Sequence, residues 1–197
     1  IRAHVDWNTG KFSHGISLSR ASTSGHIQNS DATIQRLMYG LNWQAGAHRF
    51  KGLIAGETKA FGAQNFYTSV YPHQYEETGA AVAQLTWNMD QGDWYFSGGL
   101  HGRFHQDRFE LYREGEGWYE LTDDGFYVAL LPIMSAPDTA GLYAPGLSWY
   151  GGANQHRSTV GSANALARWT SGNWTVSGAA DARTETIQSN RLGQPLD

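Results

Sequence analysis

The chain has 197 residues, a formal net charge of −4 at pH 7, a mean hydropathy of −0.50 and no cysteine. The charge balance and the lack of any Lys- or Arg-rich run exclude a basic nucleic-acid footprint, and the missing thiols exclude disulfides and thiolate metal sites. Charged residues make up only 16% of the chain, below the roughly 25% of a typical soluble domain. No run reaches the roughly 20 apolar residues that a membrane-spanning helix needs.

Eight segments alternate apolar and polar residues with the period of two that is typical of β-strands. In chain order these segments are 2–8, 12–21, 32–44, 48–58, 77–88, 93–106, 157–170 and 173–186. The pattern has exceptions, because His14 falls on an apolar face and Leu53 and Val82 fall on polar ones. The sequence therefore predicts an all-β chain whose strands each have one largely apolar face.

The connections between these segments alternate in length. Four short ones share a tryptophan, a polar turn with glycine and a second aromatic residue: "VDWNTGKF" from Val5, "LNWQAGAHRF" from Leu41, "LTWNMDQGDWYF" from Leu85 and "ARWTSGNW" from Ala167. Such turns are typical of β-hairpins. The other connections are longer loops at 22–31, 59–76 and about 107–156. In the last of these, "RFELYRE" and "GFYVALLP" are plausible short strands.

Two architectures fit alternating strands of this kind. A soluble β-sandwich alternates in the same way and stays open as an alternative. Strands of more than ten residues, short turns on one side and long loops on the other favour an antiparallel transmembrane β-barrel with short periplasmic turns and long extracellular loops. Aromatic residues at the strand ends also favour the barrel, because tryptophan prefers the membrane–water interface.

A barrel assigns a role to each face of the strands. Six tryptophans would form a membrane-interface girdle on the short-turn side: Trp7, Trp43, Trp87, Trp94, Trp169 and Trp174. Polar side chains would line the lumen, with Arg36, His101, Arg103 and His105 as candidates. The two arginines would either pair with acidic residues of a plug or be hydrated. His101 and His105 lie about 13 Å apart on one strand, too far to bind one ion, so no metal site is predicted.

Aromatic residues in the long loops are the candidates for ligand binding: Phe66, Tyr67, Tyr71, Trp118, Tyr119, Trp149 and Tyr150. Exposed aromatic side chains tend to mark recognition surfaces, and packing of the loops against each other is the alternative. Acidic residues at 75–78 and at Asp123 and Asp124 are either calcium ligands in extracellular loops or solvated side chains. No catalytic motif is present, so neither an enzyme nor a catalytic cofactor is expected.

An ordered set of stretches resembles TonB-dependent outer-membrane receptors of the Bacteroidetes type. "FGAQNFYTSVYPHQYEETGA" (61–80) resembles an F-G-A-N-x-F-Y loop followed by a Y-E-E-T-x strand start. "GLHGRFHQDRFELYRE" from Gly99 and "NQHRSTVGSANALARW" from Asn154 follow in the same order. The second contains an H-R-T-D-V-Y-G-like strand start in which Thr159 replaces the Asp and the Tyr is absent. "SNRLG" from Ser189 resembles an S-x-x-L-G loop, and the cobalamin-receptor-like subgroup is the nearest.

The resemblance implies a barrel of about 22 strands with an N-terminal plug, in the cell outer membrane. Eight strands make up about a third of such a barrel, so residues 1–197 are expected to be an internal part of one β-barrel domain without the plug. An independent eight-stranded barrel is the structural alternative.

The expected function is binding and active uptake of a scarce nutrient: cobalamin, haem, a ferric siderophore or a glycan. The implied partners are outer-membrane lipid, the small nutrient, a TonB-type energy transducer acting through the absent plug, and a surface lipoprotein, with no nucleic acid. The alternative function is that of a soluble or surface β-sandwich module that recognises glycan or protein through aromatic loops.

Overall fold

The computed structural model describes residues 1–64, 71–124, 127–130, 133–135, 139–141 and 151–190. Eight strands form one large antiparallel sheet: β1 Arg2–Thr9, β2 Phe12–Thr23, β3 Ala32–Ala45, β4 His48–Gly62, β5 Tyr75–Gln91, β6 Trp94–Glu110, β11 Asn154–Ser171 and β12 Trp174–Ser189. Two small sheets pair β7 Tyr119–Leu121 with β8 Tyr127–Ala129, and β9 Ile133–Ser135 with β10 Thr139–Gly141. Within the described ranges, no helix is long and apolar enough to cross a membrane.

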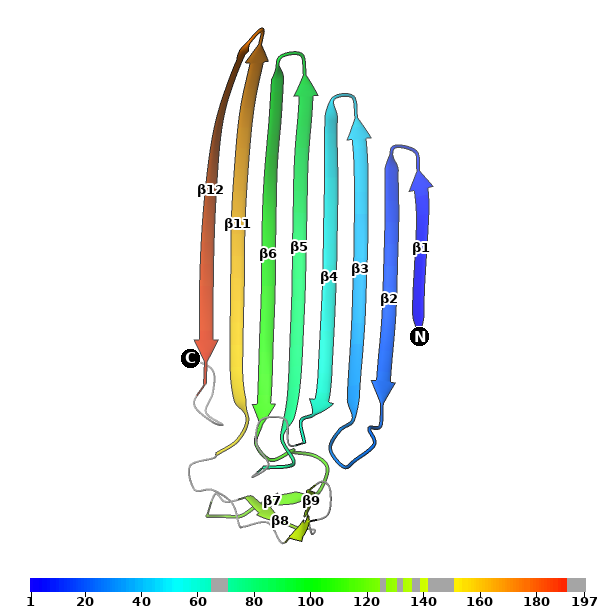
Figure 1. Ribbon diagram of the computed structural model, residues 1–197, viewed down its shortest axis with the longest axis vertical. Helices are drawn as coiled ribbons and strands as arrows, with labels where there is room; N and C mark the ends of the chain where they lie inside the picture. Colours follow the sequence, from blue (N-terminus) through cyan, green and yellow to red (C-terminus); the bar gives the residue numbers. More distant parts are fainter. Residues whose placement is uncertain (65–70, 125–126, 131–132, 136–138, 142–150, 191–197) are drawn as a thin grey trace.

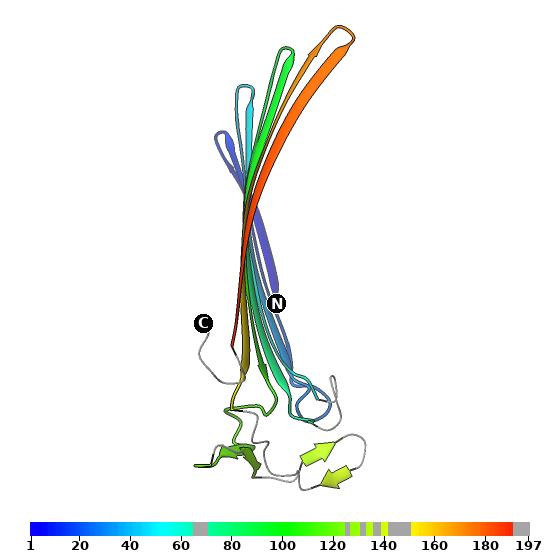
Figure 2. The same ribbon diagram turned by 90° about the vertical axis from the view of Figure 1, so that its left-hand side faces the viewer.

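The large sheet is an up-and-down meander in the order β1-β2-β3-β4-β5-β6-β11-β12 (Figure 1). It is one long, twisted layer (Figure 2). Among the described residues β1 pairs only with β2 and β12 only with β11, so the sheet is open. The predicted all-β antiparallel fold is confirmed. The eight strands do not close on themselves, so the alternative of an independent eight-stranded barrel is not what this chain forms.

Two-residue turns lie at one end of the sheet and long loops at the other (Figure 1). The first turn residue is Gly10, Gly46, Gly92 or Gly172, each with φ between 56° and 61°. A positive φ at that position is what a type II′ hairpin turn requires, and glycine adopts it without steric cost. The repeated Trp-and-Gly pattern of the sequence therefore marks the turn end of the sheet.

The predicted strands are all present, but most of them extend further toward the loops than the alternation indicates. β4 continues to Gly62, and β6 continues to Glu110. The loop expected at about 107–156 is therefore shorter, at 111–153, and contains β7 to β10. The alternation fades there because residues 59–62 on β4 and 106–110 on β6 no longer separate into an apolar and a polar face. The period-two signal therefore ends before the hydrogen-bonded ladder does.

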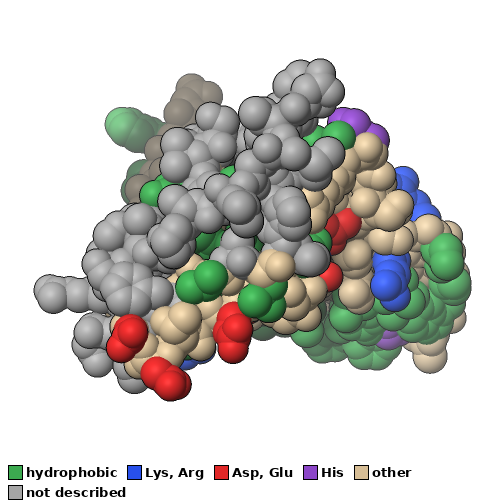
Figure 3. All heavy atoms as spheres, turned by 90° about the horizontal axis from the view of Figure 1, so that it is seen from below, with side chains coloured by type: hydrophobic (Ala, Val, Ile, Leu, Met, Phe, Trp, Pro, Cys, Tyr) green, Lys and Arg blue, Asp and Glu red, His purple; other side chains and the backbone are tan. Residues whose placement is uncertain are grey.

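The strand register collects the apolar side chains on one face. Leu18 pairs with Leu37, Leu37 with Gly56, Gly56 with Ala81, and Ala81 with Phe104. Cross-strand partners share a face, so the apolar face comprises the even-numbered residues of β6 and their partners across the sheet. The opposite, polar face carries the odd-numbered residues of β6 and their partners. Seen along the strands from the loop end, hydrophobic side chains gather on one side of the sheet (Figure 3).

The apolar face is open to its surroundings. Leu100 and Ile54 on this face are each 58% exposed, and Leu18 is 50% exposed. The buried hydrophobic residues of the described chain lie instead in and beside the loops: Ala63, Leu111, Tyr112, Tyr127 and Ala153. The hydrophobic core is thus a small cluster beyond the loop end of the sheet, and among the described residues no second layer covers the apolar face.

Successive hairpins are shifted along the strand direction by a constant amount. Phe12, the first residue of β2, pairs with Trp43, which lies two residues before the end of β3. The same two-residue shift recurs where His48 pairs with Met89 and where Trp94 pairs with Trp169. Each hairpin has two strands, so the shift is one residue, or about 3.3 Å, for each strand spacing of about 4.8 Å. If all four turns lie in one plane, the strands are tilted by about 35°.

Candidate functional site

An aromatic row follows the turn end of the apolar face. All six predicted tryptophans lie on this face and within five residues of a turn. The rings of Trp7, Trp43 and Trp94 stack on neighbouring aromatic side chains, at centroid distances of 4.9 Å to His14, 4.9 Å to Phe50 and 5.6 Å to Phe96. The predicted row is therefore present, whereas its contact with a membrane interface remains a prediction.

His14, the exception on the apolar face, has one ring nitrogen in a hydrogen bond. Its ring stacks on Trp7 with an interplanar angle of 8°, and its Nδ1 lies 2.9 Å from the Tyr39 hydroxyl. In a similar way, the Trp87 indole N–H donates a hydrogen bond to Nδ1 of His48 at 3.1 Å. Aromatic rings with one hydrogen-bonding atom are suited to a half-wet, half-apolar environment.

An apolar band extends from the aromatic row toward the loops. It runs from Phe12 to Leu18 on β2 and from Trp94 to Phe104 on β6. At about 3.3 Å per residue these stretches are about 20 Å and about 33 Å long, and a tilt of about 35° reduces them to about 16 Å and 27 Å. A transmembrane barrel has an apolar band of about 25 Å. Beyond the band, the strands continue with largely polar residues on both faces.

The four predicted lumen candidates share the polar face. The Nε of Arg36 donates to Glu57 on β4, and Glu57 also pairs with Lys59 at 2.8 Å. The contact of Arg36 with a plug remains a prediction. His101 and Arg103 pair across the sheet with Gln84 and Val82. On the same face Nδ1 of His105 is buried and has no hydrogen-bond partner among the described residues. That this face lines a lumen remains a prediction.

Arg113 links the loops into one cap over the end of the sheet. Its side chain is 9% exposed, and its guanidinium donates two hydrogen bonds to the Asp31 carboxylate, one of them 3.0 Å long. It also donates to Oδ1 of Asn29 at 3.1 Å, pairs with Glu116 at 3.1 Å and lies 4.3 Å above the Tyr75 ring. The Arg113 guanidinium holds the pKa of the Asp31 carboxyl below its ordinary value.

Asn29 extends the same junction to the loop that follows β4. Its side-chain amide donates to the backbone carbonyls of Pro72 and Gln74, at 3.1 and 2.6 Å. Asn29 is 4% exposed and adopts a φ of 56°, a conformation that asparagine tolerates better than most residues. We define the loop cap as residues 24–31, 63–64, 71–74 and 111–121. Sequence reasoning missed Asn29, Asp31 and Arg113, because residues 82 to 84 positions apart carry no local signal of their pairing.

The loop aromatics pack against each other inside the cap. Tyr71 meets Tyr112 edge-on at 6.0 Å, and Tyr112 lies 4.9 Å from Tyr119. Trp118 lies 4.5 Å from the ring of His73. Three of the predicted ligand-binding residues, Tyr71, Trp118 and Tyr119, pack against other loops. This arrangement is the predicted alternative to an exposed binding surface. The other predicted ligand-binding residues lie outside the described residues: Phe66, Tyr67, Trp149 and Tyr150.

His73 is the most strongly perturbed base of the cap. It is 2% exposed, and its Nδ1 lies 2.9 Å from the Tyr119 hydroxyl. Burial, with a smaller contribution from the positive charge of Arg113, lowers the pKa of His73 from 6.5 to about 4. Burial likewise raises the pKa of Tyr112 to about 12. The cap is thus built around a neutral imidazole and neutral phenols at neutral pH.

Acidification is expected to loosen the loop cap. In the unfolded cap His73 binds a proton below about pH 6.5, whereas in the folded cap it stays neutral down to about pH 4. The stability of the cap that is present above pH 6.5 is therefore lost as the pH falls from 6.5 to about 4. The full loss is of the order of 3 kcal/mol. Amide exchange should therefore accelerate between pH 7 and pH 4.5, after correction for intrinsic rates, at Ala63 and Arg113, whose N–H groups donate to carbonyls within the cap. The amides of β3 should not change, and a His73→Phe variant should lose the effect.

The acidic stretches show no shared cation site. Glu76 and Glu77 are adjacent on β5 and therefore point to opposite faces. No group of three or more His, Asp or Glu residues that could hold a metal ion occurs within the described part of the chain. Calcium in the loops remains a prediction.

Comparison with known proteins adds no relative to this geometry. No protein-family model matches the chain, and neither the curated proteins nor the solved structures contain a match.

Proposed function

We propose that this chain is part of the wall of an outer-membrane β-barrel of the TonB-dependent receptor type. In this proposal the apolar face meets lipid, the polar face meets the lumen, and the loop end receives a scarce nutrient for active uptake. Cobalamin, haem, a ferric siderophore and a glycan are the candidate nutrients. A plug domain, which these residues do not include, would fill the lumen and engage the energy transducer.

The single observation that carries the proposal is the exposed apolar band with its aromatic row. Eight neighbouring strands present apolar side chains on one face, and the tryptophans follow the stagger of the turns rather than a straight line across the sheet. A row that follows the turns lies parallel to the membrane plane when the strands tilt by about 35°. This angle is at the lower end of the tilt of transmembrane barrels. A soluble sheet has no such reason to keep its aromatic residues level with its turns.

The open edges and the long polar strand ends support the same proposal. In lipid every backbone N–H and C=O group needs a partner, so β1 and β12 would each pair with a further strand of a larger barrel. Beyond the apolar band, β5 and β6 continue on the same face for three more rows, in which the pairs are Gly79–Gln106, Glu77–Arg108 and Tyr75–Glu110. Strands that rise above the membrane in this way carry their loops well outside it.

The loop cap would serve the receptor as a rigid platform. Arg113 and Asn29 join three loops through hydrogen bonds that are largely shielded from water. Loops that are ordered before a ligand arrives lose less conformational entropy when it binds. The buried His105 Nδ1 on the polar face is suited to accept or donate a hydrogen bond to a plug or a ligand.

Electrophoresis of the native protein tests the proposal. Transmembrane barrels resist SDS until they are heated, so protein extracted from outer membranes should change its mobility on boiling, in a band far larger than the 21.8 kDa of this chain. Unchanged mobility, or recovery in the soluble fraction, would instead favour the β-sandwich binding module. Cyanocobalamin is the first ligand to add, because the sequence resemblance is nearest to the cobalamin-receptor-like subgroup.

A further inference from the structure

The apolar face changes character abruptly at one row of paired residues. The last mainly apolar row contains Leu18, Leu37, Gly56, Ala81 and Phe104. The next row on the same face, which we name the boundary row, consists of Arg20, Gln35, Thr58, Gly79, Gln106, Arg157 and Gln188. It contains two arginines and three glutamines, and none of its seven residues is acidic. A row of this kind is complementary to anionic groups.

Arg157 has a positive charge without an ion-pair partner among the described residues. Its guanidinium lies 5.9 Å above the ring of Phe104, the last apolar residue of the band on β6. No carboxylate of the described residues forms an ion pair with Arg157, whereas Arg36, Arg108 and Arg113 each have one. The aliphatic stem of an arginine can lie along apolar surface while its charged end reaches the polar side. Arg157 is therefore placed at the edge of the band with its charge available.

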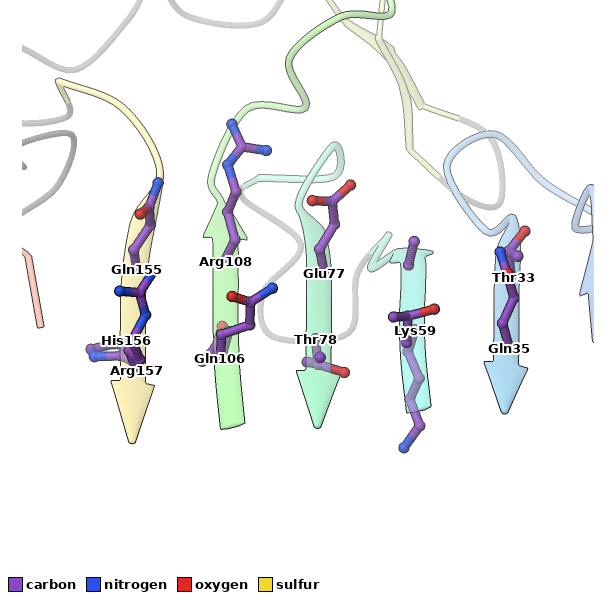
Figure 4. A pocket seen from close by; sticks show the side chains of 14 residues that line it. Thr33, Gln35, Lys59, Glu77, Thr78, Gln106, Arg108, Gln155, His156 and Arg157 are labelled. Carbon is purple, nitrogen blue, oxygen red and sulfur yellow. The ribbon is translucent and has the colours of Figure 1, made fainter. Parts of the chain in front are cut away.

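A polar recess opens beside Arg157. It has a volume of about 370 Å³ and is lined by residues of five neighbouring strands, β3, β4, β5, β6 and β11 (Figure 4). Gln106, the cross-strand partner of Arg157, contributes amide hydrogen-bonding groups, and its side chain lies over Gly79, where an added Cβ would come within 3.2 Å. The recess thus offers a guanidinium and a carboxamide side by side.

An apolar recess adjoins the polar one on the same face. Its volume is about 640 Å³, and it shares Gln35, Thr58 and Gly79 with the polar recess. Toward the turns it is lined by Leu18, Leu37, Gly56, Ala81 and Phe104. The two recesses meet at the boundary row, so together they form one trough with a polar end and an apolar end. That arrangement matches an amphiphile with a polar headgroup and a hydrocarbon chain.

The charges around the polar recess fix where an anion would bind. Arg108 is already paired with Glu110 and Glu114. Glu77 lies one row beyond the boundary row, toward the loops. Its negative charge repels an anion and so disfavours a binding position closer to the loops. Asp107 also lines the recess, but it belongs to the opposite face of β6 from Gln106. The Arg157–Gln106 pair is therefore the part of the recess that remains favourable for a phosphate, through charge-assisted hydrogen bonds.

We infer that the boundary row binds the phosphate-bearing headgroup of a membrane lipid. The phosphate lies against Arg157 and Gln106, and the acyl chain follows the apolar recess toward the turns. This inference rests on the proposed function, because it needs the apolar face to meet lipid. It adds a specific lipid site to a surface that would otherwise only exclude water.

Native mass spectrometry of the whole protein extracted from membranes in detergent tests the site. Palmitoyl-oleoyl phosphatidylglycerol and the diacylglycerol with the same chains are the two probes. The phospholipid should bind in preference, and Arg157→Gln should weaken its binding about fivefold, the effect of one cation near a lipid surface. Diacylglycerol binding should not change. Arg168→Gln is the matched control, because Arg168 lies on the polar face of the same strand, 4.8 Å above the Tyr95 ring.

The other possible outcomes distinguish failure of the lipid site from failure of the barrel proposal. Equal binding of the two probes to a membrane-inserted protein would overturn the lipid site and leave the barrel proposal intact. Displacement of the phospholipid by millimolar inorganic phosphate would also overturn it, since the site would then recognise phosphate alone. Recovery of the native protein in the soluble fraction would overturn both. Because Arg157 and Arg20 are exposed, Arg20→Gln provides a second variant with little risk to folding.

Discussion

Replacing Arg113 by alanine is expected to destabilise the loop cap by about 1.5–3 kcal/mol, because it removes the charge-assisted hydrogen bonds to Asp31 and leaves the buried Asn29 without its partner. The sheet should stay folded, since β2 to β6 are held by their own ladders. Amide exchange measures the effect: Ala63 and Gln64, whose N–H groups donate to Gln74 and Asn29, should exchange at least about tenfold faster. Arg113→Lys should recover only part of the protection, because lysine cannot form the paired hydrogen bonds to a carboxylate.

Arg183→Ala is the control for the removal of a charge. Arg183 pairs with Glu185 at 3.0 Å on an exposed stretch of β12, and an ion pair of this kind contributes about 1 kcal/mol or less. Its loss should leave exchange in the loop cap unchanged. Unaltered exchange at Ala63 in the Arg113→Ala variant would show that Arg113 does not hold the loops together.

Leu100→Arg is expected to prevent assembly of the protein into the membrane. Leu100 is 58% exposed on the apolar face, opposite Leu85, and six residues from the start of β6. With the tilt of the strands, this places it about 16 Å from the turns, near the middle of a 25 Å band. An arginine there costs about 2–4 kcal/mol in a lipid-facing position. The yield of heat-modifiable protein in the outer membrane is the quantity to measure.

Leu53→Arg is the matched control. Leu53 lies one row away on the polar face, next to Gln84 and Gly40, so the same change adds a charge beside polar neighbours. Normal assembly of Leu53→Arg together with failure of Leu100→Arg fits the lipid-facing assignment. If Leu100→Arg yields an aggregated soluble protein, the apolar face is the core of a sandwich. If it assembles normally, the apolar face meets neither lipid nor a core.

The sequence predicts the sheet well where one face is apolar and less well where both are polar. Between Leu37 and Trp43, or between Trp94 and Phe104, alternation gives the strand, its faces and its end at the turn. Past Thr58 on β4 and past Gln106 on β6 the strands continue without a one-sided pattern. The missing signal explains why the long loop was expected to begin at residue 107 and not at 111.

The loop cap is the part that the sequence does not predict. Arg113, Asp31 and Asn29 are ordinary loop residues, and only the meander brings the ends of β2, β4 and β6 together at one edge. Tyr71, Trp118 and Tyr119 are conspicuous as aromatic loop residues, but composition alone does not distinguish an exposed binding surface from loops packed on each other. The apolar band is predictable by contrast, because each strand's own alternation defines it.

Single-cysteine scanning along β6 is the most direct test of the central claim that the apolar face meets lipid, and the chain contains no native cysteine to remove. Each residue from 95 to 110 is replaced in turn, labelled with a polarity-sensitive fluorophore and exposed to lipid-borne and water-soluble quenchers. We expect even positions from 96 to 104 to be quenched from lipid, odd positions up to 105 from water, and positions 106 to 109 from water. Glu110 is 1% exposed and serves as the buried reference. Even positions that neither quencher reaches would mean a packed core, and would contradict the account.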